Sequence, residues 1–256
     1  MNHWMDFSHT QPPARPLVIG HRGASAHAPE NTLASFRLAL DQGADGIEFD
    51  VKRSQSGEVV IMHDVSVDRT TNGSGNVHQL SLHQLRQLDA GNGEHVPTLD
   101  ELFEELGARD AARGRPFLFN VEVTNYTTPQ DGLEQVVIEV VRRHNISERV
   151  MFSSFNPLSV RKLSQLAPEI PRGILYSGDM PIHLRNVWLA PFMPHQFRHP
   201  QLKMVTADYV QKLLQKGLRV NTWTVNEPVD MRHLIKCGVN VLMGDSPKTM
   251  KEVTGD

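Results

Sequence analysis

Residues 43–64 read GADGIEFDVKRSQSGEVVIMHD and contain the pattern on which the fold prediction rests. Residues 46–52 are largely apolar, which is typical of a parallel strand that is covered on both faces. Glu48 and Asp50 interrupt this run two positions apart, and side chains two apart on a strand lie on the same side. A buried carboxylate pair is costly unless it lies at an open end and is compensated, so this strand is expected to enter a functional site.

Seven other apolar segments alternate with amphipathic ones along the chain. The eight predicted strands cover residues 17–20, 46–52, 117–123, 149–153, 172–175, 187–190, 219–223 and 240–243. Strand and helix in repeated alternation predict a parallel α/β protein. We expect residues 16–256 to form one (β/α)8 TIM barrel, a fold that typically takes ~250 residues. An open Rossmann-like sheet is the competing architecture, and it is disfavoured because HRGASA stands where its GxGxxG motif would be.

Three segments depart from this rhythm. Residues 64–97 are rich in Asn, Gly, Ser and His and are too long for an ordinary loop, so we expect an ordered insertion on the rim after the second strand. Residues 178–200 contain three histidines and four prolines, which break any long helix, and their role stays open. Residues 1–15 are expected to form a loose N-terminal arm.

The bulk properties limit the classes of function. A net charge of −3 argues against a nucleic-acid binder, although it permits a small anionic ligand beside a divalent cation. The single cysteine, Cys237, permits no internal disulfide and fits a reducing compartment. The sequence contains no run of the ~20 apolar residues that a membrane span needs. We expect a cytoplasmic protein, and its oligomeric state stays open.

Ionisable side chains stand at the ends of several predicted strands. Glu48 and Asp50 lie on one strand, and Glu122 lies in FLFNVEVT on another. Three hard oxygen donors that meet at one barrel mouth suit a divalent cation such as Mg²⁺, Mn²⁺ or Ca²⁺. Two ordinary alternatives stay open, namely solvated carboxylates on an edge strand and a rim carboxylate paired with an arginine.

Two of the thirteen histidines, His21 in LVIGHRG and His63 in VVIMHD, come directly after apolar runs. Active sites of barrels lie at the carboxyl ends of the strands, so both imidazoles would share the mouth with the acids. An unperturbed pKa of ~6.5 suits histidine to proton transfer at neutral pH. Arg22, next to His21, is a candidate phosphate ligand, although an arginine is as often a salt-bridge partner.

Five blocks of sequence, HRGASAHAPENTLASF, GADGIEFDVKRSQSGEVVIMHD, NVEV, SSFNP and VNTWTVNE, resemble the signature of the glycerophosphodiester phosphodiesterase family. The resemblance extends from Val18 to Pro247. It implies a (β/α)8 barrel with a small insertion after the second unit, which agrees with the segment 64–97. It also implies an enzyme that hydrolyses small-molecule glycerophosphodiesters to glycerol 3-phosphate and an alcohol.

The resemblance also implies roles for the candidate residues. His21 and His63 would act as general acid and base. Glu48, Asp50 and Glu122 would hold one divalent cation, often Mg²⁺ or Ca²⁺, with Mn²⁺ as a further candidate. The nucleophile would be the substrate's own glycerol 2-hydroxyl, which gives a cyclic intermediate, or a water molecule.

Further positions take supporting roles. Arg22 would contact the phosphate, and Phe155 and Trp223 would form an apolar wall for the glycerol end, although such aromatic residues are more often part of a core. Asn31 is expected to cap the helix that follows it, with Glu30 as a candidate support for the site.

The sequence departs from the family pattern at two places. Thr124 stands where the family usually has a lysine, two residues after the third carboxylate. This removes a positive charge near the phosphate, which Lys52 or Lys203 would have to replace. Gly244 stands before Asp245 where a threonine-aspartate ending is more usual, and we expect Asp245 to give mainly local support.

Two rival functions remain. A lysophospholipase D-like or sphingomyelinase D-like enzyme would use the same barrel and cation on a lipid, and would need an apolar rim. The insertion 64–97 is polar and has no aromatic residue, which favours the soluble diester. A non-catalytic binding barrel is supported only by Thr124.

Overall fold

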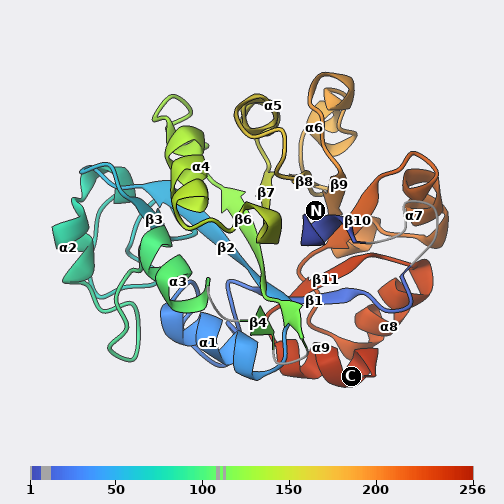
Figure 1. Ribbon diagram of the computed structural model, residues 1–256, viewed down its shortest axis with the longest axis horizontal. Helices are drawn as coiled ribbons and strands as arrows, with labels where there is room; N and C mark the ends of the chain where they lie inside the picture. The colour runs from blue at the N-terminus through green and yellow to red at the C-terminus, as the bar shows by residue number, and fades with distance from the viewer. Residues whose placement is uncertain (1, 7–12, 108–109, 112–113, 256) are drawn as a thin grey trace.

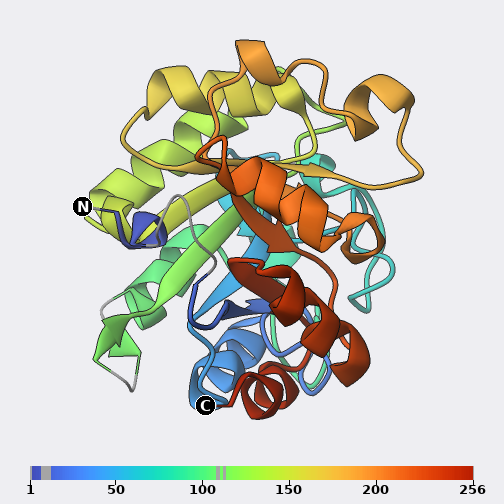
Figure 2. The same ribbon diagram turned by 90° about the vertical axis from the view of Figure 1, so that its right-hand side faces the viewer.

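Eight parallel strands close into a barrel (Figures 1 and 2) in this computed structural model, which describes residues 2–6, 13–107, 110–111 and 114–255. The strand β1 pairs with both β2 and β11, which closes the sheet. The eight strands are β1 (Leu17–His21), β2 (Gly46–Arg53), β6 (Leu118–Val123), β7 (Val150–Ser154), β8 (Arg172–Tyr176), β9 (Phe197–Pro200), β10 (Arg219–Thr222) and β11 (Val241–Gly244). The predicted (β/α)8 barrel is therefore confirmed.

Helices cover the outside of the barrel. They are α1 (Leu33–Asp41), α3 (Leu99–Leu106), α4 (Leu133–Arg143), α5 (Pro157–Leu166), α7 (Ala207–Leu214), α8 (Pro228–Cys237) and α9 (Pro247–Thr254). Their apolar faces bury the outward side chains of the strands, as in the contact between Phe36 of α1 and Phe49 of β2, whose ring centroids lie 5.7 Å apart. No helix among the described residues is long and apolar enough to cross a bilayer.

The start of α1 differs from the sequence prediction. Thr32, and not Asn31, is the N-cap, because its side chain accepts a hydrogen bond from the backbone N–H of Ser35. Asn31 instead has a φ of 58°, in the left-handed region, and is 4% exposed. Its side chain is thereby free to contact the site described below.

One predicted strand is wrong. Residues 187–190 form no strand, and Val187 has a φ of 50°, which is incompatible with extended backbone. The sixth strand of the barrel is β9, which pairs with β8 and β10. The excursion between β8 and β9 contains only the short helix α6 (Ile182–Arg185) and the 3-10 turn η4 (Ala190–Phe192).

Residues 64–97 pack around a small apolar core of their own. The short strand β3 (Val59–Ile61) runs antiparallel to β2 and leads into this segment, which contains η2 (Val77–Gln79) and α2 (Leu82–Arg86). Val67, Val77, Leu85 and Val96 are fully buried there. The remaining elements are β4 (Asp110–Ala111), β5 (Arg115–Pro116), η3 (Ser147–Arg149) and η5 (Leu202–Met204).

The described part of the N-terminal arm is packed against the barrel. Trp4, in η1 (His3–Met5), is fully buried, lies edge-on to Phe197 and donates a hydrogen bond from Nε1 to the Arg149 carbonyl at 3.0 Å. The expected loose arm is thus wrong for residues 2–6. Residues 1 and 7–12 of that arm lie outside the described residues.

Candidate active site

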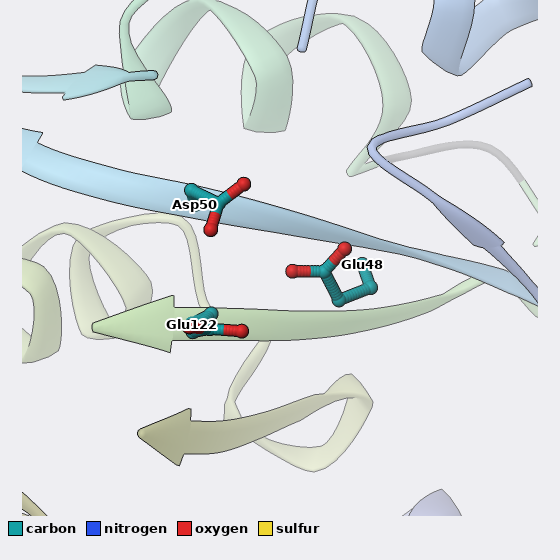
Figure 3. Close-up of side chains that lie close together, drawn as sticks. All are labelled: Glu48, Asp50 and Glu122. Atoms are coloured by element: carbon teal, nitrogen blue, oxygen red, sulfur yellow. The ribbon is translucent and has the colours of Figure 1, made fainter. Parts of the chain in front are cut away.

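Three carboxylates converge between the neighbouring strands β2 and β6 (Figure 3). Asp50 pairs in register with Glu122, and Glu48 lies two residues before Asp50 on the same side of β2. One oxygen from each carboxylate lies within 4.8 Å of the other two, and all three residues are buried. The predicted trio is therefore one cluster.

Burial and mutual repulsion make the ionised cluster unfavourable by itself. Burial, followed by the charges of Asp50 and Glu122, raises the pKa of Glu48 well above its usual value. Burial, followed by the charge of Asp50, raises the pKa of Glu122 to about 8. Such a trio would be stabilised in its ionised form by a bound cation.

Arg22 places one positive charge beside the three carboxylates. Its backbone N–H donates to Glu48 Oε2 at 3.1 Å, and its Nε lies 3.6 Å from Asp50 Oδ2. Its Nη1 donates to Glu30 Oε1 at 2.8 Å. One arginine beside three carboxylates leaves a net negative centre, and a further cation fits it.

Two other side chains hold the carboxylates in place. Asn31 Nδ2 donates to Asp50 Oδ2 at 3.0 Å, and the Tyr126 hydroxyl donates to Glu122 Oε1 at 2.9 Å. The sequence prediction gave Asn31 a capping role and did not include Tyr126. No local pattern identifies Tyr126, because it lies on the loop after β6 and reaches Glu122 by folding back.

His21 is the last residue of β1 and is oriented by Asp245. Its Nδ1 lies 2.7 Å from Asp245 Oδ1, and its Nε2 lies 4.0 Å from Glu48 Oε2. Asp245 also accepts hydrogen bonds from Asn226 at 2.6 Å and from Ser25 at 3.1 Å. Burial alone would raise the pKa of Asp245, but these partners hold it below its usual value. The expectation of mainly local support understated Asp245, which contacts a candidate catalytic residue directly.

His63 is likewise paired with an aspartate. Its Nδ1 lies 2.6 Å from Asp64 Oδ1. Arg69, from the insertion, donates through Nε to Asp64 Oδ2 at 2.6 Å and through its two terminal nitrogens to Glu30 at 2.8 Å. Burial opposes these contacts, yet the hydrogen bonds and charges of Arg69 and Arg22 lower the pKa of Glu30 to about 2. The insertion is thus joined by ion pairs to the loop after β1.

All eight predicted site residues line one cleft at the carboxyl ends of the strands. Phe155 and Trp223 form one wall, with their ring centroids 5.3 Å apart and their planes at 88°. Leu175 and Met243 complete the cleft. The full set is His21, Arg22, Glu48, Asp50, His63, Glu122, Phe155 and Trp223.

The two lysines considered as replacements for the usual lysine lie elsewhere. Lys52 is buried, and its Nζ donates to Thr124 Oγ1 at 2.7 Å and to the Thr124 carbonyl at 3.1 Å. Burial lowers the pKa of Lys52, against the raising effect of nearby acids such as Asp50. Lys203 is exposed in η5. Neither lysine lines the cleft. Lys52 contacts Thr124, which stands at the position of the usual lysine, but it does not line the cleft in place of that lysine.

Sequence and structure comparisons identify the family. The model of the glycerophosphoryl diester phosphodiesterase family matches residues 21–249. A glycerophosphodiester phosphodiesterase of Caldanaerobacter subterraneus subsp. tengcongensis is 38% identical over 243 residues, which cover 91% of this chain and 96% of that protein. The range matched by the family model contains His21, Glu48, Asp50, His63 and Glu122.

Solved structures of similar proteins have the same barrel. A phosphodiesterase of Oleispira antarctica, in complex with the product sn-glycerol-3-phosphate, has a TM-score of 0.80 at 30% identity and covers 94% of this chain and 98% of its own. A glycerophosphodiester phosphodiesterase of Agrobacterium tumefaciens has a TM-score of 0.76 at 25% identity and covers 93% and 99%. With the family match over the whole barrel, these findings show that the chain belongs to the glycerophosphoryl diester phosphodiesterase family.

Proposed function

We propose that this phosphodiesterase hydrolyses small glycerophosphodiesters with one divalent cation and a pair of histidines. The observation that supports the proposal is the composition of the cleft, which His21 and His63 line together with the buried cluster of Glu48, Asp50 and Glu122. The products would be glycerol 3-phosphate and the free alcohol.

The carboxylate cluster fits a hard divalent cation. Its donors are all oxygens and lie within 4.8 Å of one another, and burial raises the pKa of Glu48 and of Glu122. When bound there, Mg²⁺, Mn²⁺ or Ca²⁺ would polarise a phosphoryl oxygen and neutralise developing negative charge.

Arg22 would share the binding of the phosphate. Its guanidinium is held by Glu30 and lies beside Asp50, so the side chain is already oriented when the substrate enters the cleft. Phe155 and Trp223 present an apolar wall that suits the carbon atoms of the glycerol end.

Each histidine would transfer protons through Nε2. The Nδ1–H of each neutral ring donates to an aspartate, Asp245 for His21 and Asp64 for His63, which leaves the Nε2 lone pair free. One imidazole would remove the proton from the attacking hydroxyl, and the other imidazolium would give a proton to the leaving alcohol. The attacking group is the glycerol 2-hydroxyl or water, and both routes give the same final products.

A coupled assay tests the proposed function. The protein is incubated with glycerophosphocholine and Mg²⁺, Mn²⁺ or Ca²⁺, with and without a chelator, and glycerol 3-phosphate is measured with a dehydrogenase. We expect turnover that the chelator removes and the cation restores. Turnover that is equal with and without chelator would contradict the role of the cation.

Histidine variants test the acid–base pair. We expect His21→Ala and His63→Ala each to lower kcat by at least about 10²-fold, because each removes one proton-transfer group. Binding of Mn²⁺, measured by calorimetry, should persist because the three carboxylates remain. His27→Ala, an exposed histidine in the same loop as His21, is the matched control and should leave kcat unchanged. Near-normal turnover in both variants would refute the assigned roles.

A further inference from the structure

Tyr126 contacts the carboxylate cluster without lining the cleft. Its hydroxyl donates to Glu122 Oε1 at 2.9 Å and accepts a hydrogen bond from the Phe155 backbone N–H at 3.3 Å. Its ring lies edge-on to the Phe155 ring, with the ring centroids 6.3 Å apart. The lining of the cleft includes Glu122 and Phe155 but not Tyr126. Tyr126 therefore acts on the cleft through these two neighbours.

The loop that carries Tyr126 is held by the elements around it. Lys52 Nζ donates to Thr124 Oγ1 at 2.7 Å and to the Thr124 carbonyl at 3.1 Å. The side chain of Asn125 donates to Glu134, a buried residue in the first turn of α4, at 3.2 Å. The position of the family's usual lysine thus helps to fix this loop, and a fixed backbone places the phenol beside Glu122.

Each carboxylate of the cluster has one oxygen that accepts a hydrogen bond from the protein. In the described structure, no hydrogen bond reaches the second oxygen of any of the three, so these second oxygens are the ones left to bind a cation. The three donor–acceptor pairs are the Arg22 backbone N–H with Glu48 Oε2, Asn31 Nδ2 with Asp50 Oδ2, and the Tyr126 hydroxyl with Glu122 Oε1.

We propose that Tyr126 limits Glu122 to one cation-binding oxygen, and that the site therefore prefers Mg²⁺ or Mn²⁺ over Ca²⁺. The inference rests on the proposed function, because it assigns the cation to the same three carboxylates. Single oxygens from three side chains suit an octahedral cation that keeps its other positions for water and phosphate oxygens. Ca²⁺ takes about six to eight oxygens and often binds both oxygens of one carboxylate.

The hydroxyl of Tyr126 is the part of the residue that produces this preference. A hydrogen bond to one oxygen of a metal-binding carboxylate fixes the orientation of the carboxylate and leaves the other oxygen as the ligand. A cation that bound both oxygens of Glu122 would displace this hydrogen bond. The buried hydroxyl of Tyr126 would then lose its acceptor, which is unfavourable.

Calorimetric titration of the metal-free protein with Mn²⁺ and with Ca²⁺ tests the proposal. For the unmodified protein we expect a lower Kd for Mn²⁺ than for Ca²⁺. Tyr126→Phe removes the hydroxyl and keeps the ring beside Phe155. We expect this variant to raise the Kd of Mn²⁺ about tenfold, because Glu122 loses the partner that orients it. The Kd of Ca²⁺ should rise less than about threefold, because Oε1 becomes available to this cation.

The ratio of the Ca²⁺ Kd to the Mn²⁺ Kd is the deciding quantity. A general disturbance of the fold, or a changed protonation of the acids, would raise both Kd values by the same factor and leave the ratio as it was. An unchanged ratio in Tyr126→Phe therefore overturns the proposal, whether or not both cations bind more weakly. A lower Kd for Ca²⁺ than for Mn²⁺ in the unmodified protein also overturns it.

Tyr209→Phe is the matched control. Tyr209 lies in α7, its hydroxyl contacts that of Tyr176, and neither of these tyrosines lines the cleft. This variant should bind both cations as the unmodified protein does. Tyr126 is 43% exposed, so Tyr126→Phe should also unfold in urea close to the unmodified protein when both are measured in chelator.

Turnover of glycerophosphocholine gives a second readout. At saturating Mn²⁺ we expect kcat of Tyr126→Phe to stay within about threefold of the unmodified value, because the variant loses cation affinity and no substrate contact. At limiting Mn²⁺ its turnover should be clearly lower. A kcat that stays more than about tenfold low at saturating Mn²⁺ would place Tyr126 in the chemistry and contradict a positioning role.

The two proposals fail in different ways. Cation-dependent turnover together with an unchanged Kd ratio in Tyr126→Phe would refute selection by Tyr126 and leave the proposed function intact. Binding of neither cation to the unmodified protein would refute both.

Discussion

Each candidate catalytic histidine is paired with an aspartate that lies outside the carboxylate cluster. Asp245 follows β11 and contacts His21, whereas Asp64 follows His63 directly in the chain. A carboxylate that accepts the Nδ1–H fixes both the tautomer and the orientation of the imidazole. The two aspartates are therefore positioning residues, and the acids that would bind the cation are separate from them.

Replacement of Asp245 tests this role. Asp245→Asn keeps the size of the side chain but allows its amide to donate to Nδ1 of His21, which favours the wrong tautomer. We expect kcat to fall roughly 10²-fold with KM little changed, because the substrate contacts remain. Asp208→Asn, an exposed aspartate paired only with Lys212 among the contacts of the described structure, is the control and should leave kcat unchanged. A change in KM alone would contradict a positioning role.

The insertion after β3 contributes an arginine to the support of the site. Arg69 bridges Asp64 and Glu30, and these two acids in turn contact His63 and Arg22. The loop after β1 and the insertion are thereby joined beside His63 and Arg22. Through Arg69, the polar insertion can affect the orientation of His63 and Arg22.

Removal of this bridge tests the coupling. Arg69 is half exposed, so Arg69→Ala should cost less than about 1 kcal/mol in the free energy of unfolding. We expect kcat to fall about tenfold or more, because His63 and Arg22 lose part of their orientation. Arg86→Ala removes another ion pair of the insertion, with Glu101 and away from the cleft, and should leave kcat unchanged. Equal effects of the two variants on kcat would contradict the coupling.

At the scale of the whole barrel, some buried residues are expected to contribute to stability and not to activity. The candidate active site lies at the carboxyl ends of the strands, while the N-terminal turn η1 packs Trp4 against Leu17, Met151 and Phe197. The Trp4 ring contacts Phe197 and the Arg149 carbonyl, and neither residue lines the cleft. Changes there should therefore affect unfolding and leave the chemistry intact.

Two tryptophans provide a matched comparison of this point. Trp4→Ala removes a fully buried ring and should lower the free energy of unfolding by about 3–5 kcal/mol, measured by urea denaturation. Trp188→Ala removes a ring that is 59% exposed and should cost less than about 0.5 kcal/mol. Turnover of glycerophosphocholine by the folded Trp4→Ala protein should match that of the unmodified protein. A small cost for Trp4→Ala would show that the arm contributes little.

The carboxylate cluster makes the stability of the metal-free protein depend on pH. Between the usual value of 4.5 and the folded pKa of about 8, folded Glu122 retains a proton that the unfolded chain has lost, so stability decreases as pH rises. Burial lowers the pKa of His195 to about 4 and of His199 to about 3, which has the opposite effect but only below ~6.5. The window from pH 6.5 to 8.0 therefore reports mainly on the acids.

We expect the free energy of unfolding in chelator to fall by about 1–2 kcal/mol from pH 6.5 to pH 8.0. The measurement is urea denaturation at both values. Glu122→Gln cannot ionise and should show a smaller decrease. Saturating Mn²⁺ should remove the decrease, because the cation binds the ionised acids. A stability that is constant or rises over this window in chelator would contradict the raised pKa.

The local pattern of apolar residues in the sequence was sufficient to predict most strands of the barrel. Continuous apolar runs located seven of the eight strands, because a parallel strand covered on both faces must be apolar wherever it lies. The positions of Glu48, Asp50 and Glu122 at strand ends likewise predicted their convergence, since all parallel strands end at one mouth. The strand β9 was missed because its sequence, FRHP, is less apolar than the run at 187–190, and its extended form depends on pairing with β8 and β10.

Other features depend on contacts between residues that are distant in the chain. Tyr126 reaches Glu122 only because its loop folds back, and Asp245 reaches His21 only because β11 closes the barrel beside β1. The excursion between β8 and β9 is held by the packing of Val187 and Met193 against side chains of β8. Strand character is local because it follows from burial along one segment. Hydrogen bonds between side chains that are distant in the chain form only in the closed barrel, because no single segment contains both partners. The cleft needs the closed barrel for the same reason, since its lining comes from several segments.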